Sequence, residues 1–401
     1  MTPESRNPRI LHITRNLPPL VGGMERLNWH IADELSRHAE VRVIGPKGAA
    51  AQRPPQAHVT EAPLRPLWLF LLASGWQAVR TARAWRPHVV LAGSGLTAPL
   101  AWLAARCCGA KTAAYLHGLD IAVRHPAYRM LWLPFIRRMD RCIVNSTQTL
   151  QLALNAGVAA EKIRIVHPGV SLSEQPQSER AIHAFKSRYE LENKTILLSV
   201  GRLSRRKGLL EFVEQALPWI VRQRPDTLLI VIGGAPKDAL HPTFHSIESI
   251  CAAAQAVGVL ENIKFMGNVS EFELLTAYEA ASLHVFPVRH IAGDPEGFGM
   301  VAIEAAAHGL PTVAFATGGV TDAVAEGQSG RLVKADDYDA LAQVVVQILA
   351  DGPAMWRTGA IAFAQEFTWP AFGGKMRNAL PVKFWTNTPA SMAAAQGASS
   401  P

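Results

Sequence analysis

The chain has 401 residues, of which 49% are hydrophobic and 18% are charged, so it is long enough for two domains that each bury their own core. This composition excludes an intrinsically disordered protein, and 30 glycines are too few for a collagen-like one. The four cysteines form no C-x-x-C pair, which excludes a disulfide scaffold and disfavours a zinc site. We interpret them as reduced thiols of a cytosolic protein.

The net charge of +8 is unevenly distributed along the chain. Residues 1–170 carry 21 Lys and Arg against 9 Asp and Glu, a net of +12, whereas residues 171–401 carry 19 against 23, a net of −4. A basic half predicts an anionic partner, and nucleic acid, an anionic membrane surface and a phosphorylated substrate all fit. Neither a run of about 18 apolar residues nor a signal peptide is found, so we expect a cytoplasmic protein.

Short apolar segments alternate with amphipathic segments along the whole chain. In the first half, six strands are predicted at residues 9–14, 41–45, 88–93, 112–118, 141–146 and 163–170. In the second half, six more are predicted at residues 195–201, 227–234, 262–267, 283–287, 312–319 and 331–333. Helices are predicted between them, for example at residues 25–37, 207–223 and 338–349. Continuous apolar strands separated by helices predict an α/β protein with doubly wound parallel sheets.

A polar segment at residues 171–193 separates the two sets of strands and marks a domain boundary. We expect a first Rossmann-like domain at residues 1–175 and a second at residues 176–366. A last helix at residues 367–380 is expected to pack back on the first domain, followed by a disordered tail at residues 381–401. The domains should face each other across a central cleft, with ligands at the carboxyl ends of the strands.

Two loops that follow predicted strands are candidate anion sites. Gly22 and Gly23 open a helix whose free N–H groups can bind an anion, although an ordinary tight turn explains the pair equally well. The segment 201–208, GRLSRRKG, places four cations at a strand-to-helix corner, with Arg202 and Lys207 at its ends. An arriving anion would relieve their repulsion, and a solvated charge run is the alternative. The chain contains no P-loop motif, which excludes a P-loop ATPase.

Two glutamates, Glu296 and Glu304, follow the predicted strand at residues 283–287. In one continuous helix their backbones would lie about 12 Å apart and about 80° off one face, whereas the paired carboxylates of glycosidases lie about 5–9.5 Å apart. We therefore expect Glu296 in a glycine-flanked loop, Glu304 inside the helix, and each holding a different part of one extended ligand. The alternative is a glutamate that favours the helix dipole at the N-terminus plus a solvated glutamate. Glu304, however, lies in the apolar run VAIEAAA, where an unpartnered carboxylate is costly.

One histidine and one acidic pair complete the candidates. His117 ends a predicted strand and is followed by Gly118, a position that faces the cleft, although a lone histidine is more often structural. Asp337 and Asp339 form a D-x-D motif, but they precede a predicted helix, so we interpret them as helix-capping residues. We predict no metal site.

Together these motifs resemble the retaining glycosyltransferases of family 4, which have the GT-B fold. The resemblance covers residues 9–380. Its most specific part is the glutamate pair in EGFGMVAIEAAAHGLP, followed by a strand and by Gly318 and Gly319. It implies two Rossmann-like, doubly wound domains facing a central cleft, and a nucleotide-sugar substrate held mainly by the second domain. No metal or cofactor is implied.

The resemblance also implies roles for individual residues. The implied donor-binding residues are Gly22, Gly23, Arg202, Lys207, Phe298, Gly299, Met300 and Glu304. Arg202 and Lys207 would contact the diphosphate and Glu304 the ribose. Glu296 would hold the donor sugar, with His117 beside the anomeric carbon, and we select these two as the catalytic residues. Arg205 and Arg206 make the basic cluster denser than one diphosphate requires.

In this fold the first domain receives the acceptor, and here it is the basic half. Residues 63–88 and 127–140 combine Trp and Arg with Leu and Phe, a pattern typical of membrane-interface surfaces. Core helices with a solvated basic edge are the alternative. We expect a peripheral enzyme on the inner face of the cell membrane, because each basic residue near an anionic leaflet contributes about 1 kcal/mol. Nucleic acid is disfavoured because no nucleic-acid-reading module appears.

The predicted function is transfer of a hexose from a GDP- or UDP-linked sugar to a lipid-linked glycan or glycolipid, in the synthesis of a cell-envelope polysaccharide such as lipopolysaccharide. Epimerase or phosphorylase relatives with the same fold are one alternative, but their characteristic residues are not found. A non-catalytic sugar-nucleotide-binding module is the other, and it is disfavoured by the presence of both His117 and Glu296.

Overall fold

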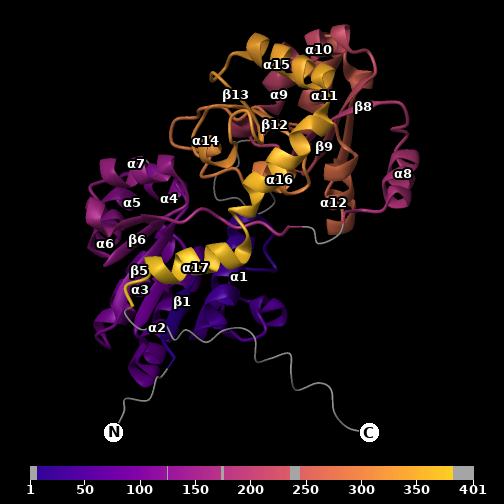
Figure 1. The fold of residues 1–401 in the computed structure, drawn as a ribbon. Coiled ribbons are helices and arrows are strands. Elements are labelled where there is room, and N and C mark those ends of the chain that lie inside the picture. Colours follow the sequence, from indigo (N-terminus) through magenta and orange to yellow (C-terminus); the bar gives the residue numbers. More distant parts are fainter. Residues whose placement is uncertain (1–6, 124, 173–175, 235–243, 383–401) are drawn as a thin grey trace, which may run out of the picture.

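The computed structural model describes residues 7–123, 125–172, 176–234 and 244–382. Within these ranges the chain forms two lobes, each built on one parallel β-sheet, with the N-terminal half in one lobe and most of the C-terminal half in the other (Figure 1). The fold class predicted from the sequence, two doubly wound Rossmann-like domains, is confirmed.

Each sheet is entirely parallel in its described pairings. In spatial order, the first sheet consists of β3 (His58–Ala62), β2 (Glu40–Pro46), β1 (Arg9–Ile13), β4 (Val89–Ala92), β5 (Lys111–Leu116), β6 (Arg141–Val144) and β7 (Ile163–Ile165). The second consists of β10 (Ile263–Gly267), β9 (Thr227–Ile232), β8 (Thr195–Val200), β11 (Leu283–Phe286), β12 (Thr312–Phe315) and β13 (Gly330–Val333). In both sheets the order reverses beside the first strand of the domain, which is where ligands of such folds bind.

Helices cover both faces of each sheet. Those of the first half are α1 (Gly23–Ser36), α2 (Leu67–Trp85), α3 (Ala98–Arg106), α4 (Leu119–Ala122), α5 (Pro126–Leu131), α6 (Leu133–Arg138) and α7 (Thr147–Asn155). Those of the second half are α8 (Glu179–Arg188), α9 (Leu209–Gln215), α10 (Leu217–Gln223), α11 (Ile247–Ala256), α12 (Glu271–Ala280), α13 (Met300–Ala307), α14 (Val320–Ala323), α15 (Tyr338–Asp351), α16 (Arg357–Gln365) and α17 (Trp369–Ala379). None of the helices in the described ranges is long and apolar enough to cross a membrane.

Burial of the strands on both faces of the sheet explains why continuous apolar runs in the sequence predict them. Successive side chains of β1 point to opposite faces, so that Leu11 and Ile13 belong to the core on one side of the first sheet and Ile10 to the core on the other. All three side chains are fully buried. A strand covered on both faces therefore needs apolar residues at every position, which is the pattern that the sequence shows.

The first sheet contains one strand more than the sequence analysis predicted. β3 (His58–Ala62) lies at the edge of the sheet and pairs with β2, and only Val59 and Ala62 of its five residues are buried. It therefore lacks the continuous apolar run by which the other strands were recognised. The prediction of six strands in the first half was wrong for this reason.

The predicted helix at residues 207–223 is interrupted. A 3-10 turn at Arg205–Lys207 is followed by the separate helices α9 and α10, which meet at Ala216. Pro218 lies in the first turn of α10, where its missing N–H is tolerated but where it cannot continue a preceding helix.

The chain returns to the first domain at its C-terminal end. α17 packs on α1, where Trp369 stacks on His30 with their ring centroids 3.6 Å apart (Figure 1). At the crossing point the Val170 N–H donates to the carbonyl oxygen of Phe367 at 2.7 Å, so the outgoing and returning segments are hydrogen-bonded to each other. The tail predicted at residues 381–401 lies, from residue 383 onward, outside the described residues.

Candidate active site

The loops selected from the sequence follow strands at the carboxyl edges of the two sheets. Gly22 and Gly23 lie where α1 begins, and His117 follows β5 in the first domain. In the second domain the segment 201–208 follows β8, and Glu296 lies between β11 and α13. Parallel strands place all such loops along one edge of their sheet, so each domain presents its candidates on one side.

Glu296 lies in a buried cluster of opposite charges. One carboxylate oxygen, Oε2, accepts hydrogen bonds from Lys207 Nζ at 2.8 Å and from Arg206 Nε at 3.1 Å. Burial by itself raises the pKa of Glu296, but the charges of Lys207 and Arg206 outweigh it and lower the pKa to about 2. Glu296 is therefore a carboxylate at all physiological pH values and can accept hydrogen bonds from sugar hydroxyls.

The second cation of this cluster, Arg206, was not selected as a site residue. Its Nη1 pairs with Asp294 and its Nε with Glu296, and nine-tenths of its side chain is buried. The sequence contains more cations here than one diphosphate requires. The structure explains the excess, because Arg206 is bound by two carboxylates of the protein, Asp294 and Glu296. Arg205 and Arg202 are exposed. Within the described ranges, Arg202 has neither a hydrogen bond nor an ion pair.

Glu304 contacts a residue of the opposite domain. Its Oε1 is paired with Arg26 of α1, and its Oε2 accepts a hydrogen bond from the Tyr278 hydroxyl at 3.2 Å. The charge of Glu304 raises the pKa of Arg26 in turn. Neither partner was selected from the sequence. The sequence feature that could have identified Arg26 is its position three residues after Gly23, in the first turn of α1. We find no such feature for Tyr278.

His117 is buried in the first domain and has a defined orientation. Its Nε2 lies 2.9 Å from the carbonyl oxygen of Gly93, which can only accept a hydrogen bond, so Nε2 is the donor. The His117 backbone N–H donates to Asp120 Oδ2 at 3.0 Å. These two contacts fix both the ring and the loop, as a residue that positions a substrate requires.

Close contacts at two glycines bring the loops of the two domains together. A Cβ on Gly297 would lie 2.7 Å from the carbonyl oxygen of His117, so no other residue fits beside Glu296 without moving one of the loops. A Cβ on Gly23 would lie 3.3 Å from Met300 Sδ, which places the glycine loop of the first domain against the start of α13. Gly299 caps α13 with a φ of +96°, a conformation that favours glycine. Phe298 is buried as a whole residue.

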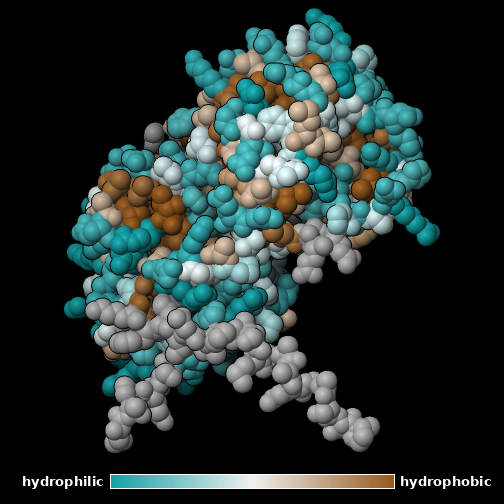
Figure 2. Space-filling view, in the orientation of Figure 1, coloured by the Kyte–Doolittle hydropathy of each residue, from teal (hydrophilic) through white to brown (hydrophobic). Residues whose placement is uncertain are grey.

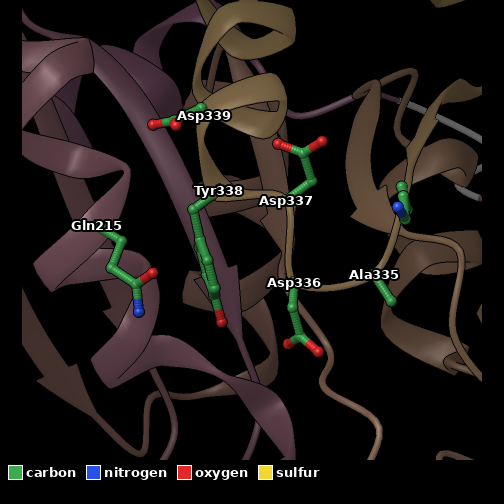
Figure 3. Close-up of a pocket in the computed structure, with 7 residues that line it drawn as sticks. Gln215, Ala335, Asp336, Asp337, Tyr338 and Asp339 are labelled. Carbon is green, nitrogen blue, oxygen red and sulfur yellow. The ribbon is translucent and has the colours of Figure 1, made fainter.

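Of the acidic motif near the C-terminus, Asp337 has the capping role that we predicted, whereas Asp339 lies within the first turn of α15. The Asp337 side chain accepts a hydrogen bond from the Ala340 N–H at 3.0 Å and caps α15. A cavity of about 360 Å³ opens there, and Figure 3 shows Tyr338 lying between Gln215 of α9 and Asp336. Within the described ranges no group of three or more His, Cys, Asp or Glu side chains could hold a metal ion.

Comparison with known proteins identifies the class to which this fold and site belong. Residues 21–174 match the model described as Glycosyltransferase Family 4, and residues 182–363 match the model described as Glycosyl transferases group 1. One relative is the GDP-mannose-dependent alpha-(1-6)-phosphatidylinositol monomannoside mannosyltransferase of Mycolicibacterium smegmatis. It is 29% identical over 392 residues, which are 92% of this chain and 98% of that protein. A D-inositol 3-phosphate glycosyltransferase of a Mycobacterium species is 32% identical over 231 residues, 57% of this chain and 49% of that protein.

Solved structures share the fold at lower sequence identity. HepE of Anabaena in complex with UDP superposes with a TM-score of 0.77 at 20% identity, over 92% of this chain and 98% of that one. WaaG, a glycosyltransferase involved in lipopolysaccharide biosynthesis, has a TM-score of 0.65 at 17% identity over the same shares. Two facing Rossmann-like domains with these loops define a GT-B glycosyltransferase. The chain belongs to the family 4 glycosyltransferases, which are retaining enzymes that use nucleotide-sugar donors, as the sequence resemblance implied.

Proposed function

We propose that this enzyme transfers a hexose from a GDP- or UDP-linked sugar, without a metal ion, to a lipid-linked glycan or glycolipid of the cell envelope. The contact between the loop of Glu296 and the loop of His117 is the observation that supports this most, because it joins a sugar-binding carboxylate and a buried histidine across the two domains. The Mycolicibacterium relative is named for GDP-mannose and a phosphatidylinositol mannoside, and HepE is in complex with UDP. We therefore include both GDP-linked and UDP-linked sugars as candidate donors.

The donor's diphosphate would lie beside Lys207, Arg202 and the start of α13, with Gly23 on the opposite side. As the bond from the anomeric carbon to the diphosphate oxygen breaks, the two cations and the helix N-terminus neutralise the charge on the leaving group. The acceptor oxygen forms its bond to the anomeric carbon on the face that the leaving group departs from. The acceptor's proton passes to a phosphate oxygen of the nucleoside diphosphate, so that no carboxylate nucleophile is needed.

Glu296 and Glu304 would hold two ends of this donor. Glu296 would accept hydrogen bonds from sugar hydroxyls while Lys207, which it already contacts, reaches the diphosphate. Glu304 would accept from the ribose hydroxyls, for which Arg26 has to release one carboxylate oxygen. Approach of the two domains would exclude water and limit hydrolysis of the donor.

Exposed apolar and basic side chains support a peripheral membrane enzyme. On α2, Trp68, Leu72 and Trp76 are all more than 60% exposed and follow each other at intervals of four residues. The guanidinium of Arg80, one turn further, lies 5.3 Å from the ring centre of Trp76. Four-residue spacing places these side chains along one face of the helix, as in an interfacial amphipathic helix.

A second apolar surface lies on the same domain, over α4 and α5 (Figure 2). Leu119, Met130 and Leu131 are its exposed large hydrophobic residues. Together with the net charge of +12 of residues 1–170, these surfaces support binding to the inner, anionic face of the cell membrane.

Two measurements test the proposed function. Thermal shift with GDP- and UDP-linked hexoses should identify the donor, because only a ligand that binds the native state raises the melting temperature.

His117→Ala and Glu296→Ala should each reduce sugar transfer by at least about 10²-fold while the protein stays folded. Arg222→Ala, which changes an exposed residue of α10, is the matched control and should keep full activity. Full turnover in either site variant would overturn the assignment.

A further inference from the structure

Two hydrogen-bonded pairs join the helices α12 and α13 beside the Glu304 carboxylate. The Tyr278 hydroxyl of α12 donates to Oε2 of Glu304 at 3.2 Å. The next residue of α12, Glu279, accepts a hydrogen bond at 2.9 Å from Nδ1 of His308, which is the C-cap of α13. Glu304 and His308 are four residues apart, so both lie on the side of α13 that faces α12.

The second pair fixes the aromatic ring that forms the first. The rings of Tyr278 and His308 are stacked, with their centroids 5.5 Å apart and their planes at 5° to each other. Only 1% of Tyr278 is exposed. The other oxygen of Glu279, Oε2, accepts a hydrogen bond from the backbone N–H of Gln177 at 2.8 Å. Because both oxygens of Glu279 are bonded, Glu279 fixes the His308 ring, and that ring in turn fixes the Tyr278 ring whose hydroxyl reaches Glu304.

The pair of Glu279 and His308 is buried, although burial of polar side chains is costly. The side chain of His308 is 4% exposed and that of Glu279 is 5% exposed. Apolar residues of similar volume can often replace such a pair without loss of stability, so packing alone does not require it. What the pair provides is a fixed orientation of the ring beside Tyr278.

The other partner of Glu304 is held much less firmly. Arg26 reaches Oε1 of Glu304 from α1 of the opposite domain, and the Arg26 side chain is 46% exposed. An exposed guanidinium can turn into solvent at little cost. If the Tyr278 hydroxyl lost Glu304 instead, it would stay in the protein interior without a partner, which is costly. Arg26 is therefore the partner that a ligand can replace more easily.

We propose that Glu279 and His308 are positioning residues of the donor site, which act on the nucleotide through Tyr278. They keep the Tyr278 hydroxyl on Oε2 of Glu304, so that the carboxylate is already oriented when a ribose hydroxyl arrives. The ribose hydroxyl then takes the place of Arg26, and Tyr278 stays bonded. This rests on the proposed function, in that it takes Glu304 as the residue that binds the ribose.

The first experiment measures equilibrium binding of GDP, UDP and inorganic pyrophosphate to the full chain. His308→Asn keeps an N–H for Glu279 but removes the ring that stacks on Tyr278. It should weaken binding of the nucleoside diphosphate by about three- to tenfold, the effect of one misplaced hydrogen bond. Binding of pyrophosphate, which has no ribose, should not change. His183→Asn changes an exposed histidine of α8 and should match wild type with both ligands.

Two results of this experiment would overturn the proposal. One is unchanged affinity of His308→Asn for the nucleoside diphosphate. The other is an equal loss of affinity for pyrophosphate, because a general disturbance of the donor site would then explain the effect.

The second experiment asks whether His308 acts through the Tyr278 hydroxyl. Tyr278→Phe removes that hydroxyl, keeps the ring, and should by itself weaken binding of the nucleoside diphosphate by about three- to tenfold. His308→Asn added to Tyr278→Phe should cause no further loss, because the group through which His308 acts is already absent. Additive losses would overturn the proposal. Tighter binding by Tyr278→Phe would also overturn it, because the ribose would then displace Tyr278 and not Arg26.

The two experiments separate this proposal from the proposed function. If wild type binds neither GDP nor UDP, the proposed function fails, and the positioning role of His308 and Glu279 fails with it. If wild type binds one of them and Tyr278→Phe binds it equally well, only the positioning role fails. That comparison holds even where His308→Asn does not fold.

Discussion

Arg26 of the first domain and Glu304 of the second form an ion pair across the domain interface, and Tyr278 donates to the other oxygen of the same carboxylate. Both oxygens of Glu304 are thus bonded to protein groups. For the proposed ribose site this means that a ribose hydroxyl has to replace one of these two partners, Arg26 or Tyr278, on the Glu304 carboxylate.

Glu304→Gln should weaken binding of GDP or UDP by about 10- to 100-fold, because hydrogen bonds to a charged group contribute about 1.5–3 kcal/mol. Equilibrium binding of the nucleoside diphosphate is the measurement. Arg26→Gln is the companion variant. It should lower the free energy of unfolding by less than about 1 kcal/mol, because the Arg26 side chain is 46% exposed. Unchanged nucleotide affinity in Glu304→Gln would contradict the ribose assignment.

Removal of Arg206 should destabilise the protein strongly. Arg206→Met leaves Asp294 without its partner and Glu296 with only Lys207, and breaking a buried ion pair in this way costs about 3–5 kcal/mol. Arg205→Met changes its exposed neighbour and should stay within about 0.5 kcal/mol of wild type. The measurement is the free energy of unfolding of wild type, Arg206→Met and Arg205→Met, obtained by urea denaturation at pH 7. Equal stability of the two variants would show that Arg206 is not part of the folded core of the site.

Stability below pH 5 should depend on Glu296. Its pKa is about 2 in the folded protein against an ordinary value of 4.5, so its contribution to stability is complete above pH 4.5 and is lost as the pH falls toward 2. Urea midpoints between pH 3 and pH 6 should fall more steeply for wild type than for Glu296→Gln, which cannot titrate at this position. Parallel curves would show that other carboxylates dominate the acid transition.

Membrane binding should require the exposed face of α2. The triple variant of Trp68, Leu72 and Trp76 to Ser should reduce sedimentation with anionic liposomes by about tenfold or more, since three large apolar side chains are removed. Met355→Ser, which changes an exposed apolar residue of the second domain, should bind as wild type does. Added salt should weaken binding of wild type. Failure of wild type to bind at low salt would reject the membrane proposal itself.

The sequence was most informative where function and fold impose local patterns. Buried parallel strands need continuous apolar runs, and loops that meet a ligand carry glycines and charges directly after those runs, which is how Glu296 and His117 were found. β3 was missed because an edge strand is only half covered. Arg26 and Tyr278 were missed because their partner, Glu304, lies far away in the chain. The position of Arg26 in the first turn of α1 makes it a candidate, but a short window of sequence does not show that Glu304 is the partner of either residue.

Arg206 also shows that contacts with distant residues cannot be predicted from a short stretch of sequence. The run SRRK shows that cations are concentrated, but it does not show which of them are bound by carboxylates. Asp294 and Glu296, 88 and 90 residues away, both pair with Arg206, and Glu296 pairs with Lys207 as well. Three-dimensional contacts, and not composition, show how many carboxylates each cation of this run has as partners.

The hydrogen bond between Val170 and Phe367 marks where the chain crosses between the two domains. The outgoing and the returning segments lie side by side there, and α17 follows the second crossing. Trp369, Phe372 and Met376 of α17 belong to a hydrophobic core of the first domain. Truncation of the chain at residue 367 would therefore destabilise the N-terminal domain, although the deleted residues lie at the opposite end of the sequence.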